Sequence, residues 1–143
     1  MKLKIKINAE DKNNILMAGQ FNHSVYYKLD YLINGKLVAQ SSELLYKYLI
    51  AFHAALSSMK CSQSAYLNSI GGVVDIGIVK TSQEDLRVTI SCEQYTNKKS
   101  TKKTFEVSLT YRELEETYSQ LLQEIKKIAS KIKSNLNLDK LPN

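Results

Sequence analysis

The sequence predicts a single α+β domain, built on a mainly antiparallel sheet of about five to six strands with two amphipathic helices. Two patterns predict this class. Short stretches in which apolar and polar residues alternate, as in half-buried strands, recur along the chain. Two longer stretches carry apolar residues three and four apart, as in helices packed by one face, and each follows a run of strands. Runs of strands with short connections favour an antiparallel sheet that is covered by helices.

The chain opens with its clearest strand, "KLKIKI". Leu3, Ile5 and Ile7 fall on one face, and lysines occupy the other. Residues 8 to 22 are mostly polar, with a short apolar insert. This pattern predicts a loop that forms one helical turn or a short strand near Ile15 to Phe21.

Residues 23 to 40, "HSVYYKLDYLINGKLVAQ", predict a β-hairpin. Asn34 and Gly35 supply the two positive φ angles that a type I′ turn requires. This two-residue turn sets the register and pairs Ile33 with Lys36, Leu32 with Leu37 and Tyr31 with Val38.

The first amphipathic helix is expected over about residues 42 to 60. Ser41 or Ser42 is expected to cap it, with Glu43 in its first turn near the positive end of the helix dipole. Residues 61 to 72 then form a linker. Three more strands are predicted at 72–80, 86–95 and 104–110. Cys92 is expected in the core, and Asp75 is expected to face solvent.

Residues 96 to 103, "TNKKSTKK", are expected to form a polar surface loop between the last two strands. A second helix is expected over about residues 111 to 134. Thr110 and Glu113 match the capping box at its start. The predicted order is therefore ββ(β)α followed by βββα, in one domain over residues 1 to 143 with a short flexible tail from about 135.

The apolar residues of the second helix form a seam at heptad spacing, widened by Leu122 and Ala129. The widening favours packing on the protein's own sheet, and a homodimer through this helix or a membrane-surface helix are the alternatives. The seam consists of Tyr111, Leu114, Tyr118, Leu121, Ile125, Ile128 and Ile132.

Composition narrows the function. The net charge is +6, which favours anionic partners. Of the 20 basic residues, 18 are lysines, so the bidentate contacts that arginine makes to bases are not expected. The two histidines and two cysteines have no metal-ligand spacing, and no glycine-rich phosphate loop is present. We therefore predict no catalytic, cofactor-binding or metal-binding residue, no membrane association and a cytoplasmic location.

The sequence favours a small non-enzymatic protein that acts by protein–protein interaction, such as an inhibitor of a toxin or defence enzyme. The order of strands and helices is similar to that of many small immunity proteins of bacterial toxin systems and of phage-encoded antagonists. Tyrosine, common in interfaces, is abundant here. The expected partner-binding residues are Tyr26, Lys28, Asp30, Tyr46, Lys98, Lys99, Lys102 and Lys103.

The alternative is a basic protein that binds nucleic acid or a nucleotide. Its phosphate contacts would come from the lysine-rich loop and from the exposed face of the first strand, with Lys2, Lys4 and Lys6.

Overall fold

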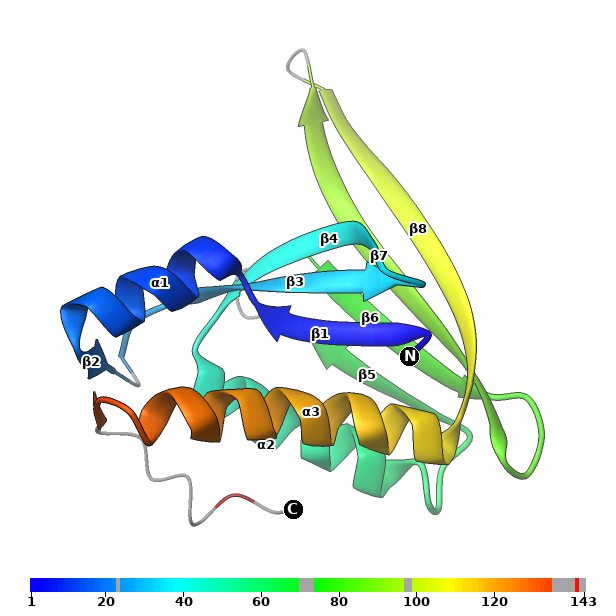
Figure 1. The fold of residues 1–143 in the computed structure, drawn as a ribbon. Helices are drawn as coiled ribbons and strands as arrows, with labels where there is room; N and C mark the ends of the chain where they lie inside the picture. The colour runs from blue at the N-terminus through cyan, green and yellow to red at the C-terminus, as the bar shows by residue number, and fades with distance from the viewer. Residues whose placement is uncertain (23, 70–73, 97–98, 135–140, 142–143) are drawn as a thin grey trace.

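The computed structural model describes residues 1–22, 24–69, 74–96, 99–134 and 141. It contains two antiparallel sheets, of three and four strands, together with helices, which confirms the predicted α+β class (Figure 1). The elements are β1 (Leu3–Ile7), α1 (Ala9–Ala18), β2 (Gln20–Phe21), β3 (Tyr27–Ile33), β4 (Lys36–Glu43), α2 (Leu45–Ser58), β5 (Ser64–Asn68), β6 (Val74–Lys80), β7 (Asp85–Thr96), β8 (Lys99–Thr110), α3 (Tyr111–Ala129) and β9 (Lys133–Ser134).

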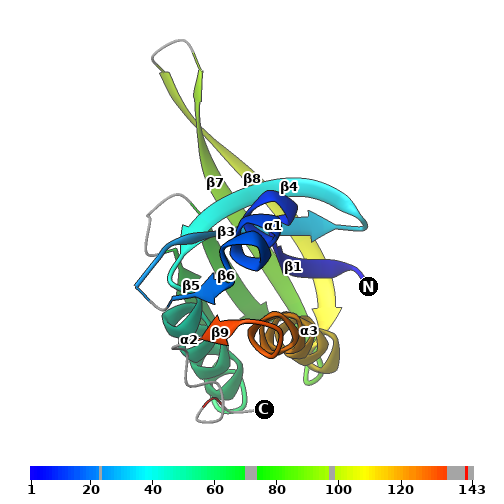
Figure 2. The same cartoon turned by 60° about the vertical axis from the view of Figure 1, so that its left-hand side comes forward.

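The strands do not form the one sheet that the sequence suggested. The smaller sheet has the order β1-β3-β4 and the larger has the order β5-β6-β7-β8, while β2 and β9 form a short parallel pair. Figure 2 shows α2 and α3 side by side on the inner side of the two sheets, where the hydrophobic core lies.

The β3–β4 hairpin confirms the predicted turn, because Asn34 and Gly35 both have positive φ, 51° and 80°. Ile33 pairs with Lys36 as expected, but a bulge shifts the register further along, and Tyr31 pairs with Ala39 instead of Val38. The extra residue turns the inner face of β4 toward the core from Ala39 onward, so the predicted pairing of Tyr31 was wrong.

Residues 9 to 18 form helix α1, whereas the sequence predicted a loop with one helical turn at most. Asn8 caps the helix by accepting hydrogen bonds from the backbone of Glu10 and Asp11, and Gly19 ends it in the left-handed conformation. Asn8 and Gly19 are residue types that commonly cap helices, so the sequence did contain these signals. The helix buries only Ile15, however, and its sequence therefore shows almost no amphipathic pattern. Of the stretch from Ile15 to Phe21, where a short strand was the alternative, only Gln20–Phe21 forms one, β2, and Ile15 to Ala18 belong to the helix.

Helix α2 begins at Leu45, and the residues expected to cap it belong to β4. Ser41 and Glu43 are buried side chains of that strand. The Ser41 hydroxyl lies 2.7 Å from the Tyr31 hydroxyl, and Ser69 Oγ donates to Glu43 Oε2 at 2.6 Å. Ser41 and Glu43 therefore form buried hydrogen bonds and do not cap the helix. Leu44 occupies the N-cap position and makes no side-chain capping hydrogen bond.

The larger sheet contains two departures from the prediction. β5 lies within the expected linker; its five residues bury only Ala65 and Leu67, too few for a clear strand signal. β8 begins at Lys99, so most of the expected lysine-rich loop is paired strand. Beyond Cys92, where β6 ends its pairing, β7 and β8 continue as a two-stranded ribbon that projects from the body (Figure 1). Cys92 is buried and Asp75 is exposed, as predicted.

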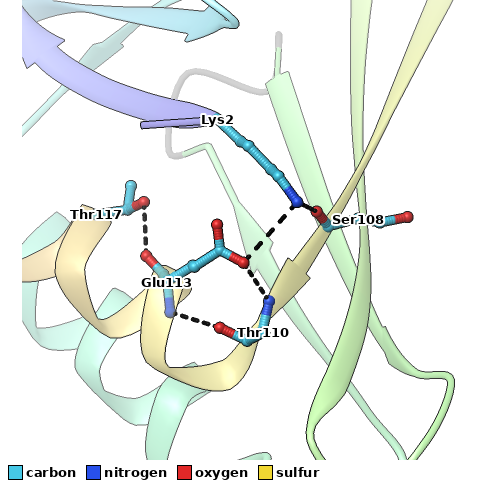
Figure 3. Close-up of polar contacts among 5 residues, drawn as sticks. All are labelled: Lys2, Ser108, Thr110, Glu113 and Thr117. Atoms are coloured by element: carbon cyan, nitrogen blue, oxygen red, sulfur yellow. Dashed lines mark hydrogen bonds and ion pairs between the residues drawn. The ribbon is translucent and has the colours of Figure 1, made fainter.

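Helix α3 begins with the predicted capping box, shown in Figure 3. Thr110 Oγ1 accepts from the Glu113 N–H at 3.1 Å, and Glu113 Oε1 accepts from the Thr110 N–H at 3.0 Å. The Lys2 ammonium lies 4.0 Å from the same carboxylate and 3.4 Å from the Ser108 carbonyl oxygen. The Thr110 hydrogen bond, helped by Lys2, lowers the pKa of the Glu113 carboxyl from its ordinary value.

The apolar seam of α3 packs inside the chain, which confirms the expected intramolecular packing. Leu114, Tyr118, Leu121, Ile125 and Ile128 are each no more than 3% exposed. The seam is therefore not available for the alternative helix-mediated homodimer. The helix ends at Ala129 instead of about 134, because the following residues turn to pair β9 with β2. The expected tail falls outside the described residues except for Leu141, which is buried.

Candidate anion-binding site

The unpaired edge of β1 lies against α3. Thr117 Oγ1 donates a hydrogen bond to the Leu3 carbonyl at 2.8 Å, and the Ile7 N–H donates to Glu124 Oε1 at 2.7 Å. Backbone groups alternate between the two edges of a strand, so those of Ile5 also point away from β3. Helix α3 thus covers the edge at both ends of β1.

Between these two contacts, β1, α1 and α3 enclose an open groove of about 480 Å³. Its apolar surface comes from Ile5, Leu16 and Ile128, one residue from each element. Polar side chains of α3 along the groove are Ser119, Gln120, Gln123 and Glu124. The basic side chains that line it are Lys4, Lys6, Lys12, Lys127 and Lys131.

Five lysines and one glutamate give the groove a formal charge of +5 − 1 = +4, compared with +6 for the whole chain. Within the part of the chain that the structure describes, none of the five ammonium groups has a carboxylate within 4.0 Å. Glu124, the only acid among the described residues of the lining, accepts its hydrogen bond from the Ile7 backbone. The positive charge is thus concentrated in a concave surface, and no described carboxylate forms an ion pair with it.

This arrangement suits an anion that is larger than a single phosphate. Lysine ammonium groups on flexible stems contact phosphate or carboxylate oxygens as point charges, without fixed geometry. The Gln120 and Gln123 amides line the same groove, and the Ile5 N–H points to it, so neutral donors are also present. The described side chains of the groove therefore offer positive charge and hydrogen-bond donors to an anion.

The predicted partner-binding residues do not come together as one surface. Asp30 is only 7% exposed, although the alternation of β3 placed it on an outward face. β3 is the central strand of its sheet, and Lys6 and Gln40 flank Asp30 on the neighbouring strands. Gln40 Nε2 and Asn8 Nδ2 donate to its carboxylate at 2.8 and 3.2 Å. The prediction that Asp30 is open to a partner was wrong.

The other predicted residues of the first half are more accessible. Tyr26 is 51% exposed and Lys28 is exposed, with the Lys28 N–H donating to Asp11 Oδ2 at 2.6 Å. Tyr46 is half-buried and packs against the core. None of these three residues lines the groove.

The lysines of the second half lie on the projecting ribbon. Lys99, Lys102 and Lys103 are exposed on β8, and Lys98 lies outside the described residues. Alternation puts Lys99 and Lys103 on one face of the ribbon and Lys102 on the other, directly opposite Glu93. The ribbon therefore spreads its lysines over two faces, unlike the groove.

Sequence reasoning found two of the five groove lysines, Lys4 and Lys6, and missed the other three. Lys127 and Lys131 are spaced four apart, so they share one face of α3, but many solvated helices show this spacing. Lys12 belongs to a helix that was not predicted. Only the packing of α1 and α3 around β1 shows that the five side chains line one groove.

Two further observations concern metal ligands and membrane-spanning helices. Among the described residues, no three His, Cys, Asp or Glu side chains lie close enough together to hold a metal ion. No helix in the described ranges is long and apolar enough to cross a membrane.

The fold defines a small α+β protein with two antiparallel sheets. No protein-family model and no curated protein matches the chain. A solved structure described as crystal structures of Trypanosoma brucei MRP1/MRP2 is similar at a TM-score of 0.37 and 16% identity, over 73% of this chain and 72% of that one. A similarity of this size carries no argument about function.

Proposed function

We propose that this protein is a small, non-enzymatic binding protein that holds the phosphate backbone of a nucleic acid in the groove between β1, α1 and α3. The observation that carries the proposal is the concentration of +4 formal charges in one concave surface, with no ion pair to its lysines from any described carboxylate. Counterion release makes such a surface bind nucleic-acid phosphates. A location in the cytosol is part of the same proposal.

The chemistry favours binding without base sequence preference. No arginine lines the groove, and arginine is the side chain that most often reads guanine by two hydrogen bonds. Among the described residues no aromatic side chain lines it either, so they offer no platform for base stacking. The expected contacts are therefore to phosphates, from flexible lysines and from amide donors of α3.

Fluorescence anisotropy with a labelled single-stranded DNA of about 20 nucleotides, and with the matching RNA, tests this proposal at about 50 and 200 mM salt. The groove variant carries Lys4, Lys6, Lys127 and Lys131→Gln. A control variant with Lys36, Lys47, Lys60 and Lys80→Gln removes the same charge from residues outside the groove.

We expect the affinity of the groove variant to be lower by about tenfold or more, and its salt slope to be smaller by about 0.7 for each phosphate that it no longer neutralises. The affinity of the control variant should fall by less than about threefold, because only the long-range field changes. An equal decrease in both variants, or no binding by the wild type at low salt, would contradict the proposal.

A protein partner, as in the expected immunity- or antagonist-type inhibitor, is the second candidate. The observation that favours it is the exposed apolar surface of α1 beside the groove, where Met17 is 86% and Leu16 is 37% exposed. An acidic protein would then meet lysines and apolar side chains together. A Met17→Ser variant separates the candidates, because Met17 does not line the groove: the substitution should weaken a protein contact and leave the salt-dependent binding of nucleic acid unchanged.

A further inference from the structure

Three of the four outer strands of the two sheets have a feature that prevents pairing with another chain. The edge of β1 is covered by α3 through Thr117 and Glu124. β4 contains a bulge, and β8 carries three exposed lysines. Cover, bulges and charge are the usual means by which proteins block edge-to-edge association.

Within the residues that the structure describes, the fourth outer strand, β5, has none of these features. Its sequence, "SAYLN", contains no charge and no proline, and its pairing with β6 is regular along all five residues. Within the described part of the chain, β6 is the only strand that pairs with it. Figure 2 shows β5 at the margin of its sheet, next to α2.

Two hydrogen bonds establish which backbone groups face the open side of β5. The Ser69 N–H donates to Val74 O at 2.9 Å, and Lys80 N–H donates to Gln63 O at 2.8 Å, so odd-numbered residues point to β6. The backbone N–H and C=O groups of the even-numbered residues therefore point outward. These residues are Ser64, Tyr66 and Asn68, and all three have exposed side chains.

Tyr66 is the most prominent of them, at 74% exposed. Its ring lies beside Gly77 on the neighbouring strand: Cε1 is 3.6 Å from where a Cβ on this glycine would be. The absence of a side chain at Gly77 leaves room for the tyrosine on the outer face of the sheet. An exposed aromatic ring at the centre of an open edge is suited to a cross-strand aromatic pair.

We propose that β5 pairs antiparallel with β5 of a second copy of this chain, about a two-fold axis at Tyr66. The edge is self-complementary: Tyr66 would face Tyr66 of the second copy, and Ser64 would face Asn68. Pairing in this register satisfies the outward backbone groups with about six hydrogen bonds. The two four-stranded sheets then become one continuous sheet of eight strands.

The uncharged edge of β5 favours a second copy over a charged partner. On the inner face, Ala65 would lie opposite Leu67, which pairs a small residue with a large one. Phe52 and His53 of α2 contact Tyr118 of α3, and the opposite flank of α2 carries Lys47, Ala51 and Ser58. A second α2 would therefore meet one lysine, whose flexible stem keeps its ammonium group in water. None of these residues lines the basic groove, so this inference is independent of the proposed function.

Sedimentation over a concentration range from about 1 μM to 1 mM tests the interface on the full chain. Tyr66→Pro removes an N–H that points to the open edge and leaves the hydrogen bonds to β6 in place, a position that tolerates proline. Tyr66→Lys places two like charges opposite each other across the axis. The control is Val79→Lys, which adds the same charge to the same face on the paired strand β6.

We expect a dimer in the wild type, a dissociation constant at least about tenfold higher in both Tyr66 variants, and a change of less than about twofold in the control. Hydrogen exchange should show the amides of Tyr66 and Asn68 protected at high concentration and exchanging at low concentration. A wild-type monomer at every concentration overturns the inference, and so does a dimer that both Tyr66 variants retain. A monomer that instead captures an extended peptide along β5 also overturns it.

Discussion

At the scale of single residues, two buried carboxylates depart most from what the sequence predicted. Asp30 was expected on an open strand face and Glu43 in the first turn of a helix, yet they are 7% and 0% exposed. Each carboxylate accepts hydrogen bonds from neutral side chains, Gln40 and Asn8 for Asp30 and Ser69 for Glu43. Such partners come from distant parts of the chain, so a local pattern cannot reveal that an acid will be buried.

Tyr31 and Tyr48 are further buried polar residues of this region. Their hydroxyl groups lie 3.0 Å apart, and that of Tyr31 also contacts Ser41. Burial raises the pKa of both tyrosines. Both hydroxyl groups keep their protons, as tyrosine does at physiological pH, and share them in these hydrogen bonds.

The turn between β3 and β4 gives a prediction at this scale. Gly35 has φ of 80°, and no described atom lies within 4 Å of a Cβ placed there, so a side chain at this position meets backbone strain and no clash with the described residues. Gly35→Val should reduce the free energy of unfolding by about 1 to 3 kcal/mol, measured by urea denaturation. Gly35→Asn is the control and should cost clearly less, because asparagine tolerates positive φ. Equal stability of the valine variant and the wild type would exclude the turn assignment.

At the scale of helices and strands, the elements that sequence reasoning missed are those that bury few residues. α1 buries one side chain and β5 buries two, so neither shows strong periodicity. By contrast, α3 buries seven residues and carries a complete capping box, and its start was predicted to the residue. Pattern-based prediction detects burial, and it succeeds where an element has a wide buried face.

The β7–β8 ribbon gives a prediction at the element scale. Replacing Lys99, Lys102 and Lys103 by serine should change the free energy of unfolding by less than about 0.5 kcal/mol, because exposed charges contribute little. Nucleic-acid affinity should fall less than in the groove variant, since these lysines are spread over two faces. Thermal melts and the same anisotropy assay check both points. If the affinity of the ribbon variant falls further than that of the groove variant, the main contact lies on the ribbon instead.

At the scale of the whole molecule, α3 joins the two sheets. Its side chains contact the β1 edge of the smaller sheet through Thr117, and Tyr118 packs on Phe52 of α2 with ring centroids 5.3 Å apart. The same helix follows directly after β8 of the larger sheet. The two sheets therefore share one core around α3.

This shared core predicts a single cooperative unfolding transition. Leu121 is 1% exposed, so Leu121→Ala should reduce the free energy of unfolding by about 2 to 5 kcal/mol, the range for truncating a buried leucine. Urea transitions followed by far-UV circular dichroism and by tyrosine fluorescence should coincide for both proteins. The exposed neighbour Gln120→Ala serves as the control, with an expected change below about 0.5 kcal/mol. Separate transitions for the two probes would show that the sheets unfold independently.

The sequence by itself determined the α+β class, the β3–β4 turn, the start of α3 and the packing of its seam, because each depends on residues close together in the chain. Only the tertiary structure determined the division into two sheets and the burial of Asp30 and Glu43. It also determined that Lys12, Lys127 and Lys131 line the same groove as Lys4 and Lys6. The physical reason is that local periodicity records only which face of an element is buried. Which surfaces meet depends on contacts between residues more than a hundred positions apart, such as Thr117 with Leu3.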